Sequence, residues 1–315
     1  MKRHKICKII FAILAVFLCV AFYELIGICI TYKKQPAVSD ATIKETQNIM
    51  SVAGRENTER AVIIEKNSQA LLERVRLIQN AKDEIILSTF AFKSDESGKL
   101  ILGALHDAAD RGVHVRILVD GMESWIDMEG NPYFYGLSSH ENVEIKLYNK
   151  ANPLKPWKTM GRMHDKYLIA DGKIYILGGR NTYNYFLGDF PGHKNFDRDV
   201  LVVCDEPQKD NSVNQLWDYF ETIWEQEDCR YFHNSKKLAD RQSVKKAVLE
   251  LQEGYQQYFE VNKEKICDTD YADETFETEK IILLSNPIHT QAKEPVVWYL
   301  SLIHISEPTR LALIS

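Results

Sequence analysis

The sequence predicts an α/β protein in which helices flank a mixed β-sheet, with a transmembrane helix at the N-terminus. Three observations predict this architecture. From residue 61 onward, short apolar runs alternate with segments whose apolar residues recur at helical spacing. Asp171-Gly172 joins two alternating runs, which is a strong signal for a β-hairpin. The run Ile9–Ile30 is almost wholly apolar, and a bilayer-spanning helix needs about 20 such residues.

Residues 1–34 are predicted to be an uncleaved membrane anchor. The flank before the apolar run is basic, with Lys2, Arg3, Lys5 and Lys8. The alternative is a cleaved signal peptide, but no clear small-x-small cleavage site follows and the apolar run is long for such a peptide. The basic flank favours a cytoplasmic N-terminus and places the rest of the chain outside the cytoplasm, although the two lysines at 33–34 reduce the asymmetry.

The elements after the anchor are predicted from local patterns, in chain order. Residues 35–60 are polar without a clear period and are predicted to be a juxtamembrane linker. Residues 61–65 form an apolar strand, and Ser68 is the predicted N-cap of a helix over 69–81. The next elements are a strand over 84–92, a helix over 98–112, and strands over 113–121 and 143–149.

Residues 161–181, with the sequence GRMHDKYLIADGKIYILGGRN, are predicted to form the hairpin. A strand over 199–205 and a helix with an aromatic face over 211–227 follow. Residues 230–278 are charged and predicted to be helical. The predicted domain therefore covers residues 61–278, including these trailing helices.

Charge and cysteine usage exclude some classes of function. Residues 1–34 hold six basic residues and Glu24, a net charge of +5, so the total of −6 leaves −11 for residues 35–315. Nucleic acid is therefore an unlikely partner, because phosphate backbones require basic stripes. The six cysteines have no spacing typical of a metal site or a disulfide framework, and neither a metal nor another cofactor is predicted.

The hairpin carries residues suited to handling a phosphate. Alternation along a strand predicts that His164 and Lys166 share one face. Gly178 and Gly179 have no side chain and can adopt positive φ, so a ligand can approach the backbone there. Asn181 can donate its amide to an anion, and Lys166 supplies a point charge. Asp171 is either the turn residue or a catalytic carboxylate, and the sequence leaves both open.

The spacing of these residues resembles the signature of the phospholipase D superfamily. The matching positions are His164, Lys166, Asp171, Gly178, Gly179 and Asn181. The flanking sequences ALHDAADRGVHVRILVDG, FDRDVLVV and YFETIW are similar to the surroundings of that motif, so the resemblance covers about residues 61–228. Together with the membrane anchor, it is closest to the bacterial cardiolipin-synthase-like branch and implies a phospholipase D-like fold.

The resemblance implies a two-step reaction without a metal. One motif histidine attacks phosphorus to form a phosphohistidine, and a histidine from a second motif protonates the leaving alcohol. Lysine and asparagine from both motifs stabilise the phosphoryl oxygens. The nucleophilic imidazole needs a carboxylate to fix its tautomer; Asp199 is the predicted partner, and Asp197, on the same strand face, is the second candidate. Either one can instead be an ordinary strand-end carboxylate.

A basic cluster lies just before His164. It consists of Lys150, Lys155, Lys158 and Arg162. Such a cluster is usually a solvated loop, but beside a phosphate site on a membrane-tethered domain it can also attract anionic headgroups. Lys158 and Arg162 are therefore candidate substrate-binding residues, as are Gly178 and Gly179.

The family builds its site from two copies of the motif, and this sequence has one. His289 and His304 each lack a lysine two residues later. Residues 279–300 nevertheless resemble the start of a second repeat, and residues 301–315 resemble translated sequencing-adapter sequence and are predicted to be a non-native tail. The second motif is expected to come from a missing C-terminal repeat or from homodimerisation, and the chain alone is expected to be inactive.

The sequence thus predicts a membrane-anchored enzyme that hydrolyses phospholipid phosphodiesters or transfers phosphatidyl groups, as cardiolipin synthases do. Water or an alcohol can be the acceptor, and the sequence does not distinguish them. Two alternatives remain open: a metal-independent nuclease of the same superfamily, and a catalytically inactive, membrane-tethered binding module. The intact motif argues against the latter.

Overall fold

The computed structural model describes residues 2–33, 59–150, 152–158, 161–206, 211–233 and 235–278, together with 281, 283 and 285. The chain divides into two compact units. One contains residues 1–52, 151–162 and 286–315, and the other contains residues 53–150 and 163–285. The predicted linker therefore lies almost wholly outside the described residues, as do nearly all of the predicted second-repeat start and the whole of the predicted tail.

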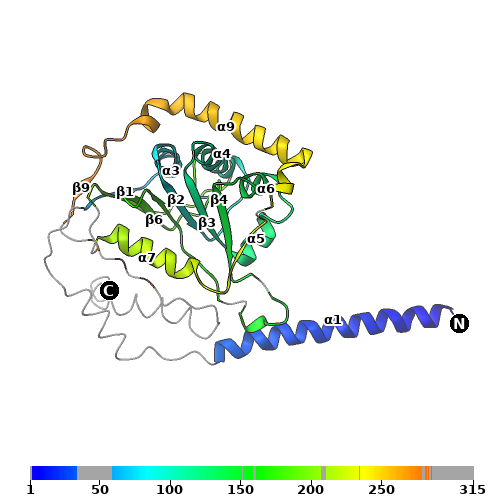
Figure 1. The fold of residues 1–315 in the computed structure, drawn as a ribbon. Helices are drawn as coiled ribbons and strands as arrows, with labels where there is room; N and C mark the ends of the chain where they lie inside the picture. The colour runs from blue at the N-terminus through cyan, green and yellow to red at the C-terminus, as the bar shows by residue number, and fades with distance from the viewer. Residues whose placement is uncertain are drawn as a thin grey trace. The chain divides into compact units, whose positions relative to one another are not determined.

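In the first unit, α1 is a single helix, Lys2–Lys33 (Figure 1). Its segment Lys5–Gly27 is long and apolar enough to cross a membrane, with a mean hydropathy of 2.7. The short 3₁₀ turn η1, Pro156–Lys158, belongs to the same unit. The apolar N-terminal helix that the sequence predicts is therefore present.

The second unit is built on a nine-stranded mixed sheet in the order β8-β4-β3-β2-β5-β6-β7-β1-β9. The central strands β2, β3 and β4 are parallel, and all other neighbours pair antiparallel. The strands are β1 Glu59–Ile64, β2 Glu84–Thr89, β3 His114–Asp120, β4 Val143–Tyr148, β5 Tyr167–Ala170, β6 Ile174–Gly178, β7 Asp199–Cys204, β8 Cys229–Tyr231 and β9 Phe276–Glu277. The predicted α/β fold with a mixed sheet is confirmed.

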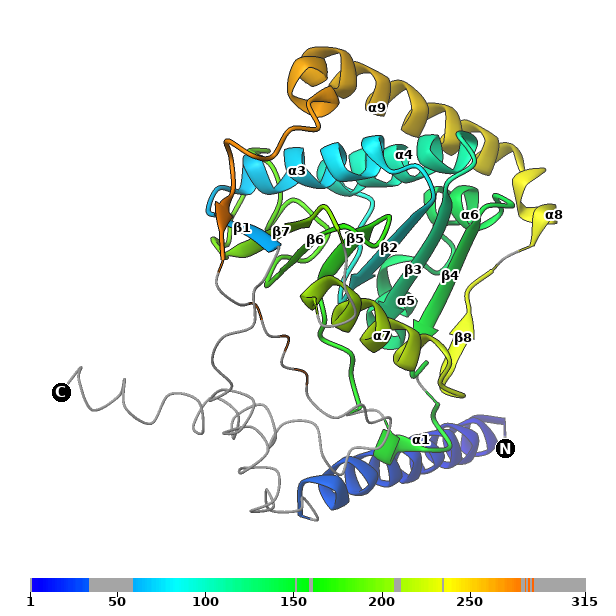
Figure 2. The ribbon, with the colours of Figure 1, turned by 60° about the vertical axis from the view of Figure 1, so that its left-hand side comes forward.

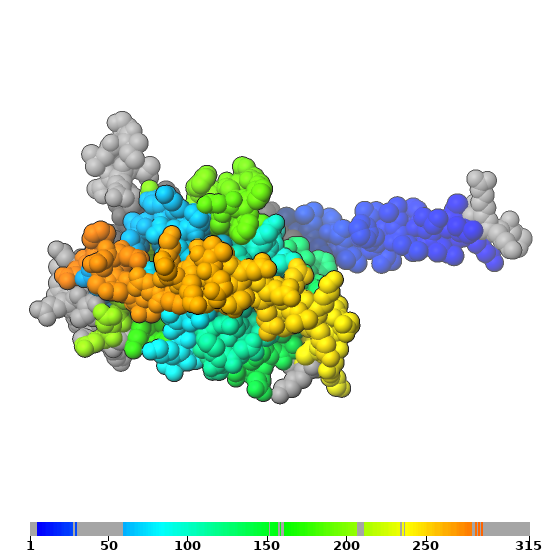
Figure 3. Space-filling model, turned by 90° about the horizontal axis from the view of Figure 1, so that it is seen from above, coloured from blue at the N-terminus to red at the C-terminus, as the bar shows by residue number. Residues whose placement is uncertain are grey.

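Helices cover both faces of this sheet. They are α3 Asn67–Asn80, α4 Glu96–Asp110, α5 Gly121–Asp127, α6 Pro132–Ser138, α7 Ser212–Trp224, α8 Lys236–Ala239 and α9 Gln242–Cys267. In Figure 2, α3 and α4 lie on one face of the sheet with α9 outside them, and α7 lies on the other face. Seen from above, α9 crosses over these inner helices (Figure 3).

Close contacts explain how the helical layer packs. A Cβ at Gly103 of α4 would lie 2.6 Å from the Leu251 carbonyl oxygen of α9, so only glycine allows these helices to approach so closely. The core between this layer and the sheet is apolar, with Leu105, Val115 and Ile145 fully buried. Burial of this continuous apolar face is the main stabilising contribution to the unit.

Three local predictions differ from the structure. The predicted cap Ser68 lies inside the first turn of α3, because the helix starts at Asn67 after Lys66 and has no side-chain cap. The strand predicted from residue 61 begins at Glu59. The segment 230–278, predicted to be helical, also contains the edge strand β9 and most of the edge strand β8. The sequence did not indicate these strands, because strands of two or three residues leave no periodic signal.

Candidate active site

The hairpin at the centre of the sheet carries the site. Strands β5 and β6 pair antiparallel from Tyr167↔Leu177 to Ala170↔Ile174. Residues 171–173 connect the paired strand ends, and Asp171 and Gly172 adopt the left-handed backbone of a tight turn, with φ of 52° and 62°. The predicted hairpin is thus confirmed, and its open end presents the residues before β5 and after β6.

His164 and Lys166 lie just before β5, and one aromatic ring contacts both. The His164 ring packs edge-on against the Phe90 ring, with centroids 4.7 Å apart. Lys166 Nζ lies 5.4 Å from the centre of the same ring and donates to the His164 carbonyl oxygen at 2.6 Å. Lys166 is buried, whereas His164 is exposed. The motif therefore presents an accessible imidazole beside a partly desolvated ammonium group.

Asn181 is brought to the same place by a connection to the segment after β2. Its Oδ1 accepts the Ala91 N–H at 3.1 Å, and Thr182 N–H donates to the Ala91 carbonyl at 3.1 Å. This connection holds Asn181 at Ala91, the residue that directly follows Phe90 in the chain. With its oxygen engaged, the amide nitrogen of Asn181 is the end that can donate to an anion.

Sequence reasoning missed Asp120, which fixes the chain just before His164. Its Oδ2 accepts the Met163 N–H at 3.2 Å, while Oδ1 accepts the Met122 N–H at 3.0 Å and the Glu123 N–H at 3.2 Å, at the start of α5. Asp120 is buried. The available signal was an aspartate at the carboxyl end of a parallel strand, directly before a glycine.

A half-buried carboxyl group, that of Asp165, lies between the two motif residues along the chain. Tyr219 of α7 donates its hydroxyl to Asp165 Oδ2 at 2.8 Å, which connects the site to the helix on the other face of the sheet. Burial raises the pKa of Asp165, whereas the hydrogen bond from Tyr219 and the positive charge of Lys166 both act to lower it, and the effect of burial is the largest. Burial also lowers the pKa of Lys166 to about 8, although the negative charges of Asp165 and Asp197 act to raise it.

This value predicts an alkaline limit on activity. Lys166 is cationic below a pH of about 8 and loses its charge as the pH rises through that value. We therefore expect kcat/KM on a chromogenic phosphodiester to fall above a pH of about 8. In Lys166→Arg the guanidinium stays charged, so this variant should lack the alkaline limit even if it is slower. An unchanged alkaline limit in Lys166→Arg would assign it to another group.

Gly178 and Gly179 have a packing role that the sequence did not indicate. Neither adopts a positive φ, in contrast to the predicted freedom of the backbone there. A Cβ at Gly179 would collide with the Asp197 carboxylate, and one at Gly178 would collide with Asp199. The glycines therefore make room for two neighbouring carboxylates, and substrate contact with them stays a prediction.

The predicted pairing of Asp199 with His164 does not agree with the contacts of Asp199. Its buried Oδ2 lies 2.9 Å from Arg74 Nη1 of α3 and 3.3 Å from Arg180 Nη1. Asp199 pairs with Ile64, which is fully buried, where β7 lies next to β1. The Asp199 side chain is on the face of the sheet that packs against α3, so its carboxylate is directed into the core. Asp197, beside Gly179 and attracted to Lys166, is the carboxylate of the pair that lies at the site.

Asp171 lies at the closed end of the hairpin, away from the residues that converge at its open end. Its carboxylate accepts three backbone N–H groups: Lys82 at 2.9 Å, Asp83 at 2.8 Å and Glu84 at 3.0 Å. These bonds tie the turn to the start of β2. Of the two interpretations left open by the sequence, the turn residue accounts for all of these contacts, and a direct catalytic role accounts for none.

We expect Asp171→Ala to reduce stability while leaving kcat/KM unchanged. The variant loses the acceptor for three N–H groups and places alanine at positive φ, which together cost about 2 kcal/mol. Asp171→Asn is the matched control, because asparagine tolerates this backbone and keeps an acceptor. Urea denaturation and steady-state kinetics of both variants test the assignment; lost activity at unchanged stability would restore a catalytic role.

The remaining predicted substrate-binding residues belong to the other unit. Lys158 ends the turn η1, and Arg162 lies in the same segment. Their role in substrate binding stays a prediction. Among the residues described, no group of three or more His, Cys, Asp or Glu side chains is arranged to hold a metal ion.

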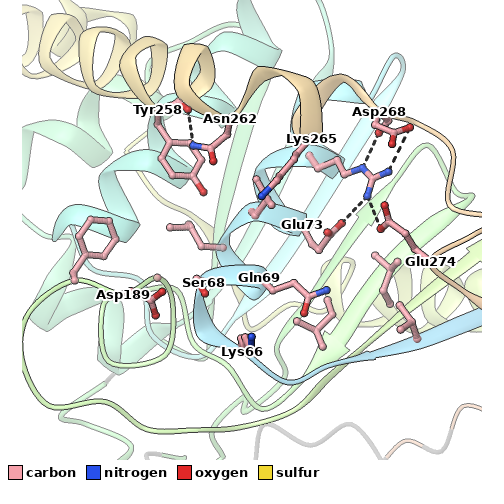
Figure 4. A pocket seen from close by; sticks show the side chains of 18 residues that line it. Lys66, Ser68, Gln69, Glu73, Asp189, Tyr258, Asn262, Lys265, Asp268 and Glu274 are labelled. Atoms are coloured by element: carbon pink, nitrogen blue, oxygen red, sulfur yellow. Dashed lines mark hydrogen bonds and ion pairs between the residues drawn. The ribbon is translucent and has the colours of Figure 1, made fainter.

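A cavity of about 820 Å³ lies elsewhere in the sheet-bearing unit, between the start of α3 and the C-terminal end of α9 (Figure 4). Apolar residues such as Leu72 line part of it, and Arg76 forms ion pairs with Glu73 and Glu274 at its edge. None of the predicted site residues lines this cavity. It is therefore separate from the site at the open end of the hairpin.

Comparisons with known proteins match this part of the chain. The family described as "Cardiolipin synthase, PLD-like domain" matches residues 75–224. An uncharacterized protein of Helicobacter pylori is 33% identical over 181 residues, which are 53% of this chain and 35% of that protein. Cardiolipin synthase C of Escherichia coli is 29% identical over 154 residues, which are 44% of this chain and 31% of that protein.

A solved structure, NucT from Helicobacter pylori, matches with a TM-score of 0.43 and 17% identity, covering 55% of this chain and 99% of that one. The chain spans about a third of the length of the two curated relatives that it matches. Its matched region contains the central sheet, the hairpin and all the residues that converge at its open end. Residues 75–224 are therefore similar to the phospholipase D-like domain of the cardiolipin synthases.

Proposed function

We propose that the protein is a membrane-anchored phosphodiesterase of the phospholipase D type that hydrolyses or transfers the phosphatidyl groups of phospholipids. The observation that carries this proposal is the convergence of His164, Lys166 and Asn181 at Phe90 and Ala91. A nucleophile, a cation and an amide donor are the groups that attack on a phosphodiester requires. The apolar α1 and the cardiolipin synthases among its relatives favour a lipid substrate.

In the proposed reaction, the imidazole of His164 attacks phosphorus, and the bond from phosphorus to the leaving alcohol oxygen breaks. The leaving oxygen takes a proton from an acid supplied by a second copy of the motif. Lys166 and Asn181 balance the charge on the non-bridging oxygens. Water or an alcohol then attacks the phosphohistidine, giving phosphatidic acid or a new phosphodiester and returning the imidazole.

Product analysis tests the reaction. If two chains pair to supply both motifs, the full chain reconstituted in phosphatidylglycerol vesicles with chelator present is expected to yield cardiolipin when an alcohol is the acceptor and phosphatidic acid when water is. The same preparation is offered DNA, since the nuclease alternative predicts cleavage that weakens steeply with salt. DNA cleavage without either lipid product would replace the proposal by the nuclease. Absence of both lipid turnover and DNA cleavage would favour the catalytically inactive binding module.

The source of the second motif has its own test. If two chains complete one site, mixing wild type with His164→Ala should lower activity more steeply than the wild-type fraction, because mixed pairs hold one histidine. A proportional fall means that each chain acts alone. His233→Ala, which changes another exposed histidine, is the control and should leave activity unchanged at every ratio.

A further inference from the structure

The segment before the catalytic hairpin packs against α1 in the first unit. Tyr23 of α1 donates its hydroxyl to the Leu154 carbonyl oxygen at 3.0 Å. Pro156, two residues later, is buried, and the turn η1 that it begins lies against α1, visible as the short green turn in Figure 2. Residues 152–158, here called the α1-contact loop, are therefore attached to one level of that helix.

The position of Tyr23 along α1 determines how deep the α1-contact loop lies in a membrane, because the loop is hydrogen-bonded to that residue. The apolar segment of α1 ends at Gly27, four residues after Tyr23, which is about 6 Å along a helix axis. Tyrosine at such a position is typical of the boundary between hydrocarbon and headgroups, where its ring is buried and its hydroxyl is hydrated. If α1 crosses the bilayer, as proposed above, the Leu154 oxygen bonded to Tyr23 lies at that boundary.

The chemistry of the loop suits that environment. Leu154 is 77% exposed, so its apolar side chain is available for contact with the headgroup layer. Lys155 is exposed beside it, and the sequence from 151 to 162 contains three basic residues and no acidic one. Apolar residues interleaved with cations at the end of a transmembrane helix are complementary to an anionic leaflet.

We propose that the α1-contact loop inserts Leu154 into the headgroup layer and binds anionic lipid headgroups through Lys155 and Lys158. This inference rests on the proposed membrane anchoring. His164 lies six positions after Lys158, and a fully extended chain of that length spans at most about 20 Å.

Photocrosslinking of the full chain in vesicles tests the location. The catalytically inactive His164→Ala protein carries photoreactive benzoylphenylalanine in place of one residue at a time: Leu154, Phe17 of α1 or Val261 of α9. Phe17 and Val261 are 68% and 84% exposed, so all three probes can reach their surroundings. We expect lipid adducts at 154 and 17, at a yield at least several-fold above that at 261.

The possible outcomes distinguish the placement of the α1-contact loop from the membrane anchoring by α1 on which it rests. Adducts at 17 but not at 154, or equal yields at 154 and 261, overturn the loop's placement while α1 remains a membrane helix. Absence of adducts at 17 and 154 overturns the anchoring, and the inference with it. Because the protein is inactive throughout, loss of catalysis cannot produce either result.

Headgroup recognition is tested with the same probe at position 154. In mixed phosphatidylglycerol and phosphatidylcholine vesicles, adducts to the anionic lipid should be enriched over its mole fraction. The substitutions Lys155→Gln and Lys158→Gln each remove one positive charge. Each should lower that enrichment by up to roughly fivefold at low salt. Lys173→Gln, an exposed lysine at the hairpin turn, is the matched control and should not change it. Equal enrichment in all variants would overturn the binding role.

Discussion

Replacing His164 with alanine is expected to abolish phosphodiester turnover while leaving the fold intact. The imidazole is exposed and packs edge-on against Phe90, so its removal should change the free energy of unfolding by less than about 0.5 kcal/mol. Loss of a nucleophile, in contrast, typically lowers kcat by roughly 10³-fold or more. Activity on phosphatidylglycerol vesicles and thermal unfolding, measured on the same preparation, separate the two effects.

The covalent step gives a sharper measurement for this variant. Acid-quenched turnover with lipid labelled at phosphorus should trap an acid-labile phosphoryl adduct in the wild type, and peptide mapping should place it on His164. The adduct should be absent from His164→Ala and present in His233→Ala. An adduct that persists in His164→Ala would make the histidine of the other motif copy the nucleophile, and His164 the acid.

Replacing Asp199 with alanine is expected to destabilise the protein strongly, because its carboxylate is the counter-ion of two buried arginines. Arg74 and Arg180 lie 2.9 and 3.3 Å from Asp199 Oδ2, and all three side chains are almost fully buried. Removing one partner of a buried pair leaves uncompensated charge and costs about 3–5 kcal/mol. In a domain of this size, that corresponds to a fall in Tm of roughly 6–20 °C.

Asp197 provides the matched control, two residues before Asp199 in the chain. It lies beside Gly179 and attracts Lys166, and it is partly exposed. We expect Asp197→Ala to change kcat/KM and its pH dependence, with little loss of stability. Asp199→Asn should fall between wild type and Asp199→Ala in stability, because it keeps an acceptor but loses the charge. The reverse pattern, with a stable but inactive Asp199→Ala, would return Asp199 to the catalytic site.

The sequence by itself determined the fold class, the hairpin and the motif residues. Periodicity is a local property, so the alternation of strands and helices was visible without tertiary contacts. The turn was equally local, because Asp171-Gly172 favours the left-handed backbone observed there. His164, Lys166 and Asn181 were identified by fixed spacing, and strands β5 and β6 needed only to pair for them to meet at one end.

Only the tertiary structure decided the roles of the carboxylates. Asp197 and Asp199 share one strand parity in the sequence, yet Asp199 meets Arg74 and Arg180 in the core, whereas Asp197 lies beside Gly179. Asp120 lies 43 positions before Met163, and sequence spacing does not reveal that its carboxylate accepts that residue's N–H. Such contacts join segments distant along the chain, and which segments meet is determined by sheet order and helix packing rather than by any local pattern.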